Sequence, residues 1–295
     1  MLGLGNSITS GSVVVASGFS PIDINKLVGW WDFTDTKVMY SDAGSTEITH
    51  GDAIYRIDNK AYTLQSNDNT ALGSFLQQGT SANRPAWHSS GYAVFSANDF
   101  LKASKDTGNV AVNKLSDTTL NGIDMTVFYI VSELGSASAD EYLLHITTAN
   151  TADRMSIYLD NATEVDSEGV TQNADRWQWH HQNNTARTNT LMNCGVNATN
   201  SKELYTVHLD NASASSFYRN GDTSDGVTNG SADNHDIDLS VNNVNVAVRI
   251  GVGAAASAGN YLNGLVHEVI VYDKALSSDE ITQVQDFLIN KHSIS

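Results

Sequence analysis

Apolar and polar residues alternate near the C-terminus with the period of a β-strand. Five branched aliphatic residues occupy every second position there: Val244, Val246, Val248, Ile250 and Val252. Successive side chains of a strand point to opposite faces, so this spacing predicts a strand with one buried face. A second strand of the same kind is expected over residues 265–272.

After Asp273 the period changes to that of an amphipathic helix. Ser277 and Glu280 have the Ser-x-x-Glu spacing of a capping box, in which two side chains satisfy free backbone N–H groups at a helix start. The apolar residues that follow share one helical face: Ile281, Val284, Phe287 and Leu288. We therefore expect the chain to close with one short capped helix.

Short apolar runs separated by turn-forming residues fill the chain between residue 27 and this ending. The runs are LVGWWDFTD, YAVFSANDFLKA, MTVFYIVSEL, YLLHITTA, RMSIYLD, WQWHHQ, ELYTVHLD and SSFYRNGD. The last contains Asn220-Gly221, the strongest hairpin signal in the chain. Helical periodicity is almost absent before residue 277, so the pattern predicts an all-β, antiparallel protein. We find no internal repeat and expect one domain over residues 27–295.

Residues 1–26 differ in composition from the rest. They are rich in Gly and Ser and carry no charge before Asp23. A frayed tail is one interpretation, and an extended arm that lies along a neighbouring subunit is the other. The number of apolar residues favours the arm: Leu2, Leu4, Ile8, Val13, Val14, Val15 and Phe19.

The chain is strongly acidic, with a net charge of −17 over 295 residues. Phosphate backbones and anionic membranes attract basic surfaces, so we expect neither nucleic acid nor membrane as a partner. The single cysteine, Cys194, excludes an intrachain disulfide and is expected to be a small apolar residue. Lys26 is the first basic residue, so we expect a mature form or a route that avoids secretion.

Several segments resemble laminin-G-like, concanavalin A-type jelly-roll domains. In the front half these are Trp30-x-Asp32, Arg84-Pro85 and the stretch from Phe95 to Leu101, which resembles one strand of the family. In the back half they are the strand pair ending in the Asn220-Gly221 hairpin, the strand Gly264-x-x-x-Glu268, and the Ser277 helix. The resemblance covers residues 27–292 and implies a jelly-roll sandwich, a scaffold that carries many functions.

The first residues, MLGLGNSITSG, resemble the openings of structural proteins of marine tailed phages, which often carry this jelly roll. The resemblance implies a virion structural protein on the exterior of the particle, as capsid decoration or head fibre. Residues 1–26 would anchor it to the major capsid protein, to other virion proteins or to sister subunits in a homo-oligomer. The alternatives are a free carbohydrate-binding lectin module and a tail receptor-binding protein.

Glycosidases of this fold place two carboxylates on one strand, usually as Glu-x-Asp-x-x-Glu. No such triplet occurs: Asp236 and Asp238 lack Glu partners, Asp140 and Glu141 would point to opposite faces, and Glu268 is alone on its strand. We therefore expect no enzymatic activity.

Glycan adhesion needs aromatic platforms with polar groups at the rim. The best local candidate comprises Trp177, Trp179, His180 and Asn183, and a cell-surface glycan would be the ligand. The two tryptophans share one face if the segment is a strand. The ordinary alternative, which the pattern favours, is a core or interface pair with polar flanks.

No cofactor is required by this interpretation, and calcium is the one candidate. Oxygen ligands for calcium should cluster in loops, and the candidates are Asp222, Asp225, Asp233 and Asp236. Their spacing is not that of an EF-hand, and solvated turn residues are the favoured alternative.

Overall fold

The computed structural model describes most of the predicted β-domain. The described residues are 18–64, 72–96, 98–104, 124–134, 140–147, 154–160, 176–182, 187–195, 201–210, 216–222, 247–253 and 260–295. Their strands form two sheets in which all strand pairs are antiparallel. The predicted all-β, jelly-roll sandwich is confirmed.

The seven-stranded sheet is built around β16. Its strands run in the order β14 (Ser216–Arg219), β13 (Glu203–Leu209), β8 (Met125–Ser132), β16 (Gly264–Tyr272), β6 (Tyr92–Phe95) and β5 (Ala86–His88). The seventh strand, β1 (Leu27–Asp32), also pairs with β16, with Asp32 opposite Glu268. Strands β6 and β1 therefore share one edge of β16, while β8 occupies the other.

The nine-stranded sheet lies opposite. Its order is β12 (Arg187–Gly195), β11 (Arg176–Gln182), β10 (Arg154–Asp160), β9 (Glu141–Thr147), β15 (Ala247–Ile250), β7 (Leu101–Ser104), β4 (Phe75–Gln77), β3 (Arg56–Asp58) and β2 (Met39–Tyr40). The predicted alternation in the Val244–Val252 segment is confirmed where it is described, because Val248 and Ile250 are buried between the sheets.

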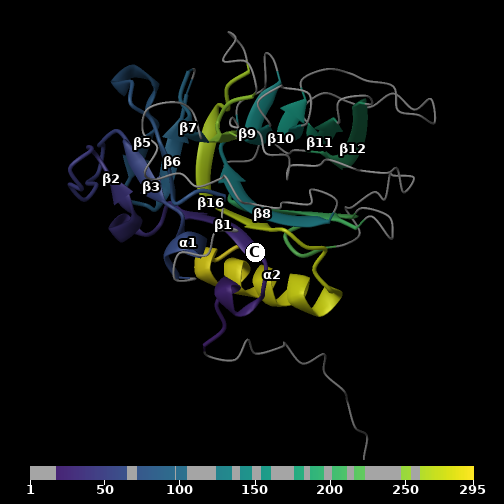
Figure 1. Cartoon of the computed structure of the whole chain (residues 1–295). Helices are drawn as coiled ribbons and strands as arrows, with labels where there is room; N and C mark the ends of the chain where they lie inside the picture. Colours follow the sequence, from purple (N-terminus) through teal and green to yellow (C-terminus); the bar gives the residue numbers. More distant parts are fainter. Residues whose placement is uncertain are drawn as a thin grey trace, which may run out of the picture.

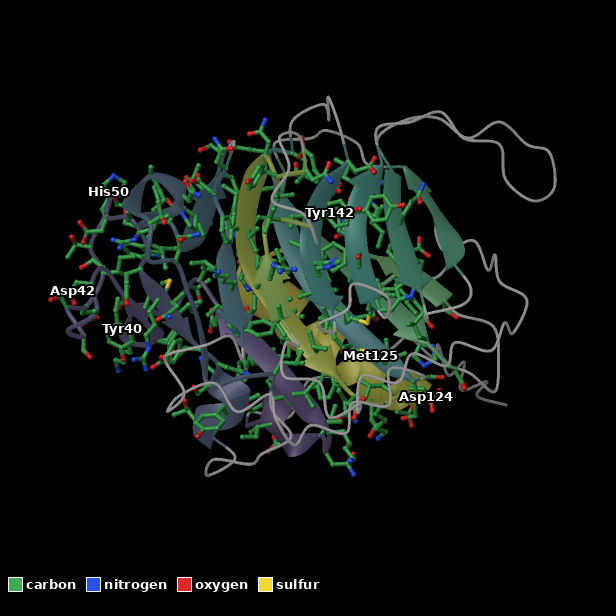
Figure 2. The ribbon with its side chains drawn as sticks, turned by 45° about the horizontal axis from the view of Figure 1, so that its top comes forward. Tyr40, Asp42, His50, Asp124, Met125 and Tyr142 are labelled. Atoms are coloured by element: carbon green, nitrogen blue, oxygen red, sulfur yellow. The ribbon has the colours of Figure 1, made fainter. Side chains whose placement is uncertain are left out.

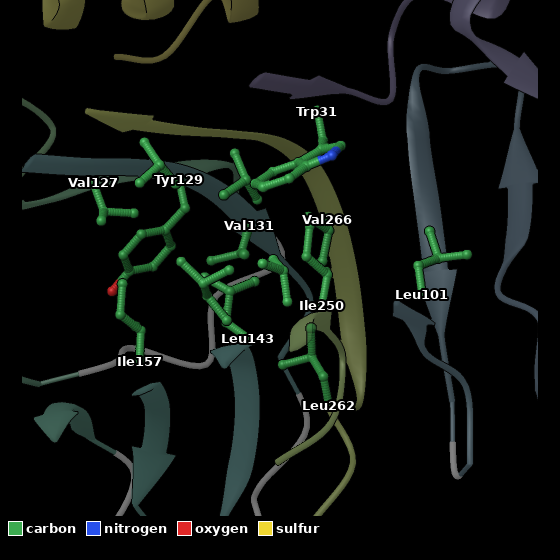
Figure 3. Close-up of a cluster of buried hydrophobic side chains, with 14 of the residues drawn as sticks. Trp31, Leu101, Val127, Tyr129, Val131, Leu143, Ile157, Ile250, Leu262 and Val266 are labelled. Carbon is green, nitrogen blue, oxygen red and sulfur yellow. The ribbon is translucent and has the colours of Figure 1, made fainter. Parts of the chain in front are cut away.

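The main hydrophobic core fills the space between the sheets. Figure 3 shows Tyr129 and Val266 of the seven-stranded sheet among Leu101, Ile157 and Ile250 of the nine-stranded sheet. All five residues are 0% exposed. Removal of this much apolar surface from water is the main source of stability for a two-layer fold.

A second hydrophobic core lies on the other face of the seven-stranded sheet, under α2 (Ser278–His292). Figure 1 shows this yellow helix lying across the sheet on the side away from β9–β12. Ile281, Val284 and Leu288 of the helix are buried there with Phe128 and Ile270 of the sheet. The prediction of one apolar helical face is confirmed for these three residues, and Phe287 is partly buried at its edge.

The start of α2 has the predicted capping box. Ser277 is the N-cap residue, its hydroxyl accepts a hydrogen bond from the Glu280 N–H, and the Glu280 carboxylate accepts one from the Ser277 N–H at 2.9 Å. None of the described helices is long and apolar enough to cross a membrane.

One local prediction needs correction, and four short helices were not predicted. The stretch from Phe95 to Leu101 is not one strand, because β6 ends at Phe95 and β7 begins at Leu101 in the other sheet. Between them the Asp99 carboxylate accepts hydrogen bonds from the Ser96 N–H (2.9 Å) and hydroxyl (2.7 Å), which closes a turn. The sequence also gave no signal for the short helices α1 (Lys60–Leu64), η1 (Pro21–Asp23), η2 (Thr36–Val38) and η3 (Ser81–Asn83).

The Asn220-Gly221 turn is present. Both residues have positive φ, 52° and 82°, as a type I′ hairpin turn requires, and Arg219 bridges to Asp222. The strand expected after Asp222 lies outside the described residues.

The described end of the predicted arm is packed on the chain's own helix. Phe19 contacts Phe287 edge-to-face, with ring centroids 6.0 Å apart, and Ile24 is 5% exposed in the second core. The hydroxyl of Tyr272 donates to the Pro21 carbonyl at 2.7 Å. The residues of the arm before position 18 lie outside the described residues.

We predict that Ser277→Ala lowers the free energy of unfolding by about 1 kcal/mol, because the first turn of α2 loses its side-chain acceptor. Urea denaturation of the purified chain measures this change. Ser278→Ala is the matched control, since Ser278 is exposed and is not the N-cap. Equal stability of the two variants would contradict a role for the capping box in anchoring α2.

Candidate functional site

Polar and aromatic side chains form one continuous row across the outer face of the nine-stranded sheet. Each is the Cα partner of the next on the neighbouring strand, from β2 to β10. We call this set the outer row: Tyr40, Arg56, Gln77, Lys102, Arg249, His145 and Ser156.

The outer row faces away from the main core because its members alternate with core residues. Met39, Ile57, Leu76, Leu101 and Val248 precede or follow them on the same strands and are all buried between the sheets. Side chains next to each other on a strand point to opposite faces. Figure 2 labels Tyr40 at one side of the molecule and Tyr142 on the teal strands further across.

Exposure changes along the outer row. Lys102 is exposed, and Tyr40, Arg56, Gln77 and Arg249 are half-buried. His145 and Ser156, at the other end, are buried and hydrogen-bonded to each other, with Nδ1 and Oγ 2.7 Å apart. The accessible half of the row is therefore the half from β2 to β15.

Three cationic side chains lie in that accessible half. Arg56 is held in place: its Nε donates to Asp58 at 2.6 Å, and its guanidinium lies 4.3 Å and 5.1 Å from the centroids of the Phe75 and Tyr40 rings. Lys102 and Arg249 are direct cross-strand partners. The ion pairs among the described residues involve the cations Arg56, Lys60, Arg219, Lys274, Lys291 and His292, not these two.

Aromatic and amide groups flank the buried end of the row. Tyr142 of β9 and Tyr158 of β10 stack with centroids 4.9 Å apart. The Tyr158 hydroxyl donates to Gln178 of β11 at 2.7 Å. Tyr142 is half-buried, so a ring at this end of the face is accessible to solvent.

A second polar cluster lies on the opposite side of the molecule, under α2. Lys291 Nζ donates to both Asp32 and Glu268 at 2.7 Å. Glu268 also accepts from Trp30 Nε1 at 2.7 Å and lies 2.6 Å from His292 Nε2. Asp32 and Glu268 are 2% and 1% exposed, so this cluster anchors the end of the helix rather than presenting an open site.

The charges of this cluster compensate one another. Burial raises the pKa of Asp32, but the ammonium groups of Lys291 and Lys60 outweigh it, and the net pKa is about 2. Glu268 is alone on its own strand, as the sequence indicated, but Asp32 and Lys291 lie next to it in the fold. The sequence did not reveal these neighbours because they are distant along the chain.

His267 lies beside this cluster, with its ring centroid 6.1 Å from that of His292. Its Nε2 is 2.9 Å from the Ser132 hydroxyl and its Nδ1 is 3.2 Å from the Gly91 carbonyl oxygen. Burial, together with the charges of His292 and Lys202, lowers the pKa of His267 from 6.5 to about 3. The side chain is 2% exposed.

The predicted tryptophan platform is wrong. Trp177 and Trp179 have no exposed surface and belong to the main core, where Trp177 contacts Tyr129 with centroids 5.0 Å apart. Alternation on β11 directs both rings inward, so the outward neighbour is Gln178. The backbone of His180 pairs with Ser156 at the end of the outer row, and Asn183 lies outside the described residues.

The calcium candidates are described only at Asp222, which is exposed in the hairpin turn. Asp225, Asp233 and Asp236 lie outside the described residues. Among the residues that the structure describes, no group of three His, Cys, Asp or Glu side chains could hold a metal ion. Of the anchoring residues, Leu2, Leu4, Ile8, Val13 and Val15 are likewise not described, and Phe19 packs on α2.

The outer row was missed because its members come from seven strands. The five strands from β2 to β15 that contribute to the row have four residues or fewer each, which is too few for a periodic signal. The one available signal was the position of Arg249 among the polar residues that alternate with Val248 and Ile250.

No protein-family model matches the chain, and no curated protein matches it. Solved structures with a similar arrangement include a Ruminococcus gnavus IT-sialidase CBM40, which is 16% identical and has a TM-score of 0.42. The match covers 56% of this chain and 84% of the CBM40 chain. A Trypanosoma rangeli sialidase in complex with DANA is 14% identical, with a TM-score of 0.47, and matches 93% of this chain and 34% of its own.

A heptameric SAP-like pentraxin from Limulus polyphemus is 16% identical, with a TM-score of 0.37, and matches 55% of this chain and 70% of its own. At these identities and TM-scores the likenesses carry no argument about function. The assignment of the fold rests on the two sheets themselves.

We predict that stability falls as the pH drops from about 6.5 towards 3, because unfolded chains protonate His267 in this range and the folded protein does not. One such group contributes up to about 1.4 kcal/mol per pH unit. Urea denaturation at several pH values gives the free energy of unfolding as a function of pH. This free energy should change less with pH in His267→Gln than in the wild type.

His50→Gln, at an exposed position, controls for the loss of one histidine. If the free energy of unfolding of His267→Gln depends on pH as steeply as that of the wild type, this side chain is not the group that causes the pH dependence.

Proposed function

We propose that the chain is a carbohydrate-binding protein whose ligand lies along the outer row of the nine-stranded sheet. The observation that carries the proposal is the row itself. Its accessible half presents an aromatic ring, an amide and three cationic groups in register on neighbouring strands.

This combination suits a sugar chain. Saccharide hydroxyls need hydrogen-bond donors and acceptors at fixed positions, which side chains on strands provide better than side chains on loops. Neighbouring strands lie about 4.8 Å apart. A polymer that crosses the strands would therefore meet one row member after another, with Tyr40 and Tyr142 as aromatic contacts towards the two ends.

The alternative, a virion structural protein in capsid decoration or a head fibre, stays a prediction from the sequence. Its anchoring residues up to Val15 lie outside the described residues, and no observation on the described part of the chain favours a virion role, a capsid partner or a location on a particle.

We predict that Gln77→Ala weakens glycan binding about fivefold, because the row loses an amide whose net hydrogen-bond contribution is about 1 kcal/mol. Affinity electrophoresis of the full chain through gels containing laminarin, dextran, polygalacturonate or methyl-esterified polygalacturonate identifies a ligand, and calorimetry with that ligand gives Kd.

Gln283→Ala is the matched control, since Gln283 is exposed on α2, across the molecule from the outer row. If a polysaccharide binds and both variants bind it like the wild type, the ligand does not use the row. If none of the polymers retards the protein, the proposed function fails.

A further inference from the structure

We infer that Lys102 and Arg249 form a subsite for an oxyanion carried on a sugar ring, a carboxylate or a sulfate. The inference rests on the proposed function, because it names the class of saccharide that the outer row would select. Three observations on these two residues and their surroundings support it.

The first is the arrangement of like charges. Lys102 and Arg249 are direct cross-strand partners on β7 and β15. Two like charges placed directly opposite each other destabilise a sheet. The chain has only 16 lysines and arginines against 33 acidic residues. Two cations are therefore rarely expected side by side by chance, and acidic side chains to neutralise them are abundant.

The second is the state of the Arg249 guanidinium. Its Nη1 is buried and has no hydrogen-bond partner in the described structure. Burial lowers the pKa of Arg249, and no carboxylate among the described residues counters that effect. Burying a guanidinium charge with one nitrogen unpaired is costly, and an oxyanion bound beside the half-buried guanidinium would offset part of that cost.

The third concerns two described carboxylates of this region, Asp58 and Asp99, which both already have partners. Asp58 pairs with Arg56 on the same face. Asp99, three residues before Lys102, accepts hydrogen bonds from Ser96 in its own turn. In the described part of the chain, two cations therefore lie side by side in the row while these two acids bond elsewhere, which favours an anion supplied by a ligand.

The overall charge makes the assignment specific. A chain with a net charge of −17 repels polyanions at long range, so non-specific attraction cannot account for binding of an acidic polymer. Binding would have to come from local contacts, and it would weaken when either cation of the pair is removed.

The test compares polymers that share one backbone and do or do not carry an anionic group. Polygalacturonate and its methyl ester share one backbone, and the ester lacks the carboxylate. Dextran sulfate and dextran form the corresponding pair for sulfate. We expect the wild-type chain to bind at least one charged polymer at least tenfold more tightly than its neutral counterpart, since hydrogen bonds to charged groups are the stronger ones.

Lys102→Ala and Lys37→Ala each remove one exposed lysine and change the net charge equally, but Lys37 lies in η2, outside the row. We expect Lys102→Ala to lose about tenfold or more in affinity for the charged polymer and Lys37→Ala to retain wild-type affinity. Arg249→Gln should lose affinity in the same way.

Thermal unfolding without ligand gives a second readout. If the pair is a ligand site under mutual repulsion, Lys102→Ala should keep or raise the melting temperature while it lowers affinity. A structural role for Lys102 would lower both. Because Lys102 is exposed, this variant tests the inference even if Arg249→Gln does not fold.

The outcomes separate the inference from the proposed function. Preference for polygalacturonate identifies a carboxylate ligand, and preference for dextran sulfate identifies a sulfate ligand; either supports the inference when Lys102→Ala also loses affinity. A preference that Lys102→Ala leaves unchanged overturns the assignment to this pair. Equal binding of charged and neutral polymers, unaffected by Lys102→Ala, overturns the oxyanion subsite and leaves carbohydrate binding intact. Binding of none of the polymers overturns both.

Discussion

Strand β16 contributes to two hydrophobic cores at once, because its residues alternate between the two faces of the central sheet. Val266, Val269 and Val271 face the other sheet, whereas Ile270 and Tyr272 face α2. The register between β16 and β8 shifts between Val266 and Glu268. This shift places Glu268 on the helix side opposite Asp32 of β1, and a buried carboxylate pair there requires cations. Lys291 at the end of α2 supplies one, so the strand register, the second core and the position of the helix depend on one another.

Strand alternation, helix capping and turn residues are local patterns, and the elements that depend on them were predicted from the sequence. The alternation around Val248, the capping box at Ser277 and the Asn220-Gly221 turn were all visible and are all present. The stretch from Phe95 to Leu101 was misjudged because a turn held by one aspartate can interrupt an apolar run without glycine or proline. Strands such as β3 and β4, three residues each, exist because neighbouring strands pair with them and not because of their own periodicity.

The candidate site could not be predicted for a related reason. Trp177 and Trp179 were correctly placed on one face of a strand, but alternation alone does not say which face is the core, and both side chains are inside. The outer row depends on the register of seven strands that are scattered between residues 40 and 249. Only one of its residues, Arg249, lies in a segment whose alternation is long enough to assign a face from sequence.

The two polar clusters differ in how their cations are compensated, and this difference supports the proposed ligand site in the outer row. Under α2, Lys60 and Lys291 are each within 3.0 Å of a carboxylate, and Asp32 carries the lowered pKa expected of a neutralised buried acid. The same chain therefore compensates its cations where they serve to hold a helix on a sheet. In the outer row it places Lys102 beside Arg249, while the described acids Asp58 and Asp99 have other partners. Such a pair costs stability in the free protein, and a cost of this kind is expected where the compensating charge comes from outside the chain.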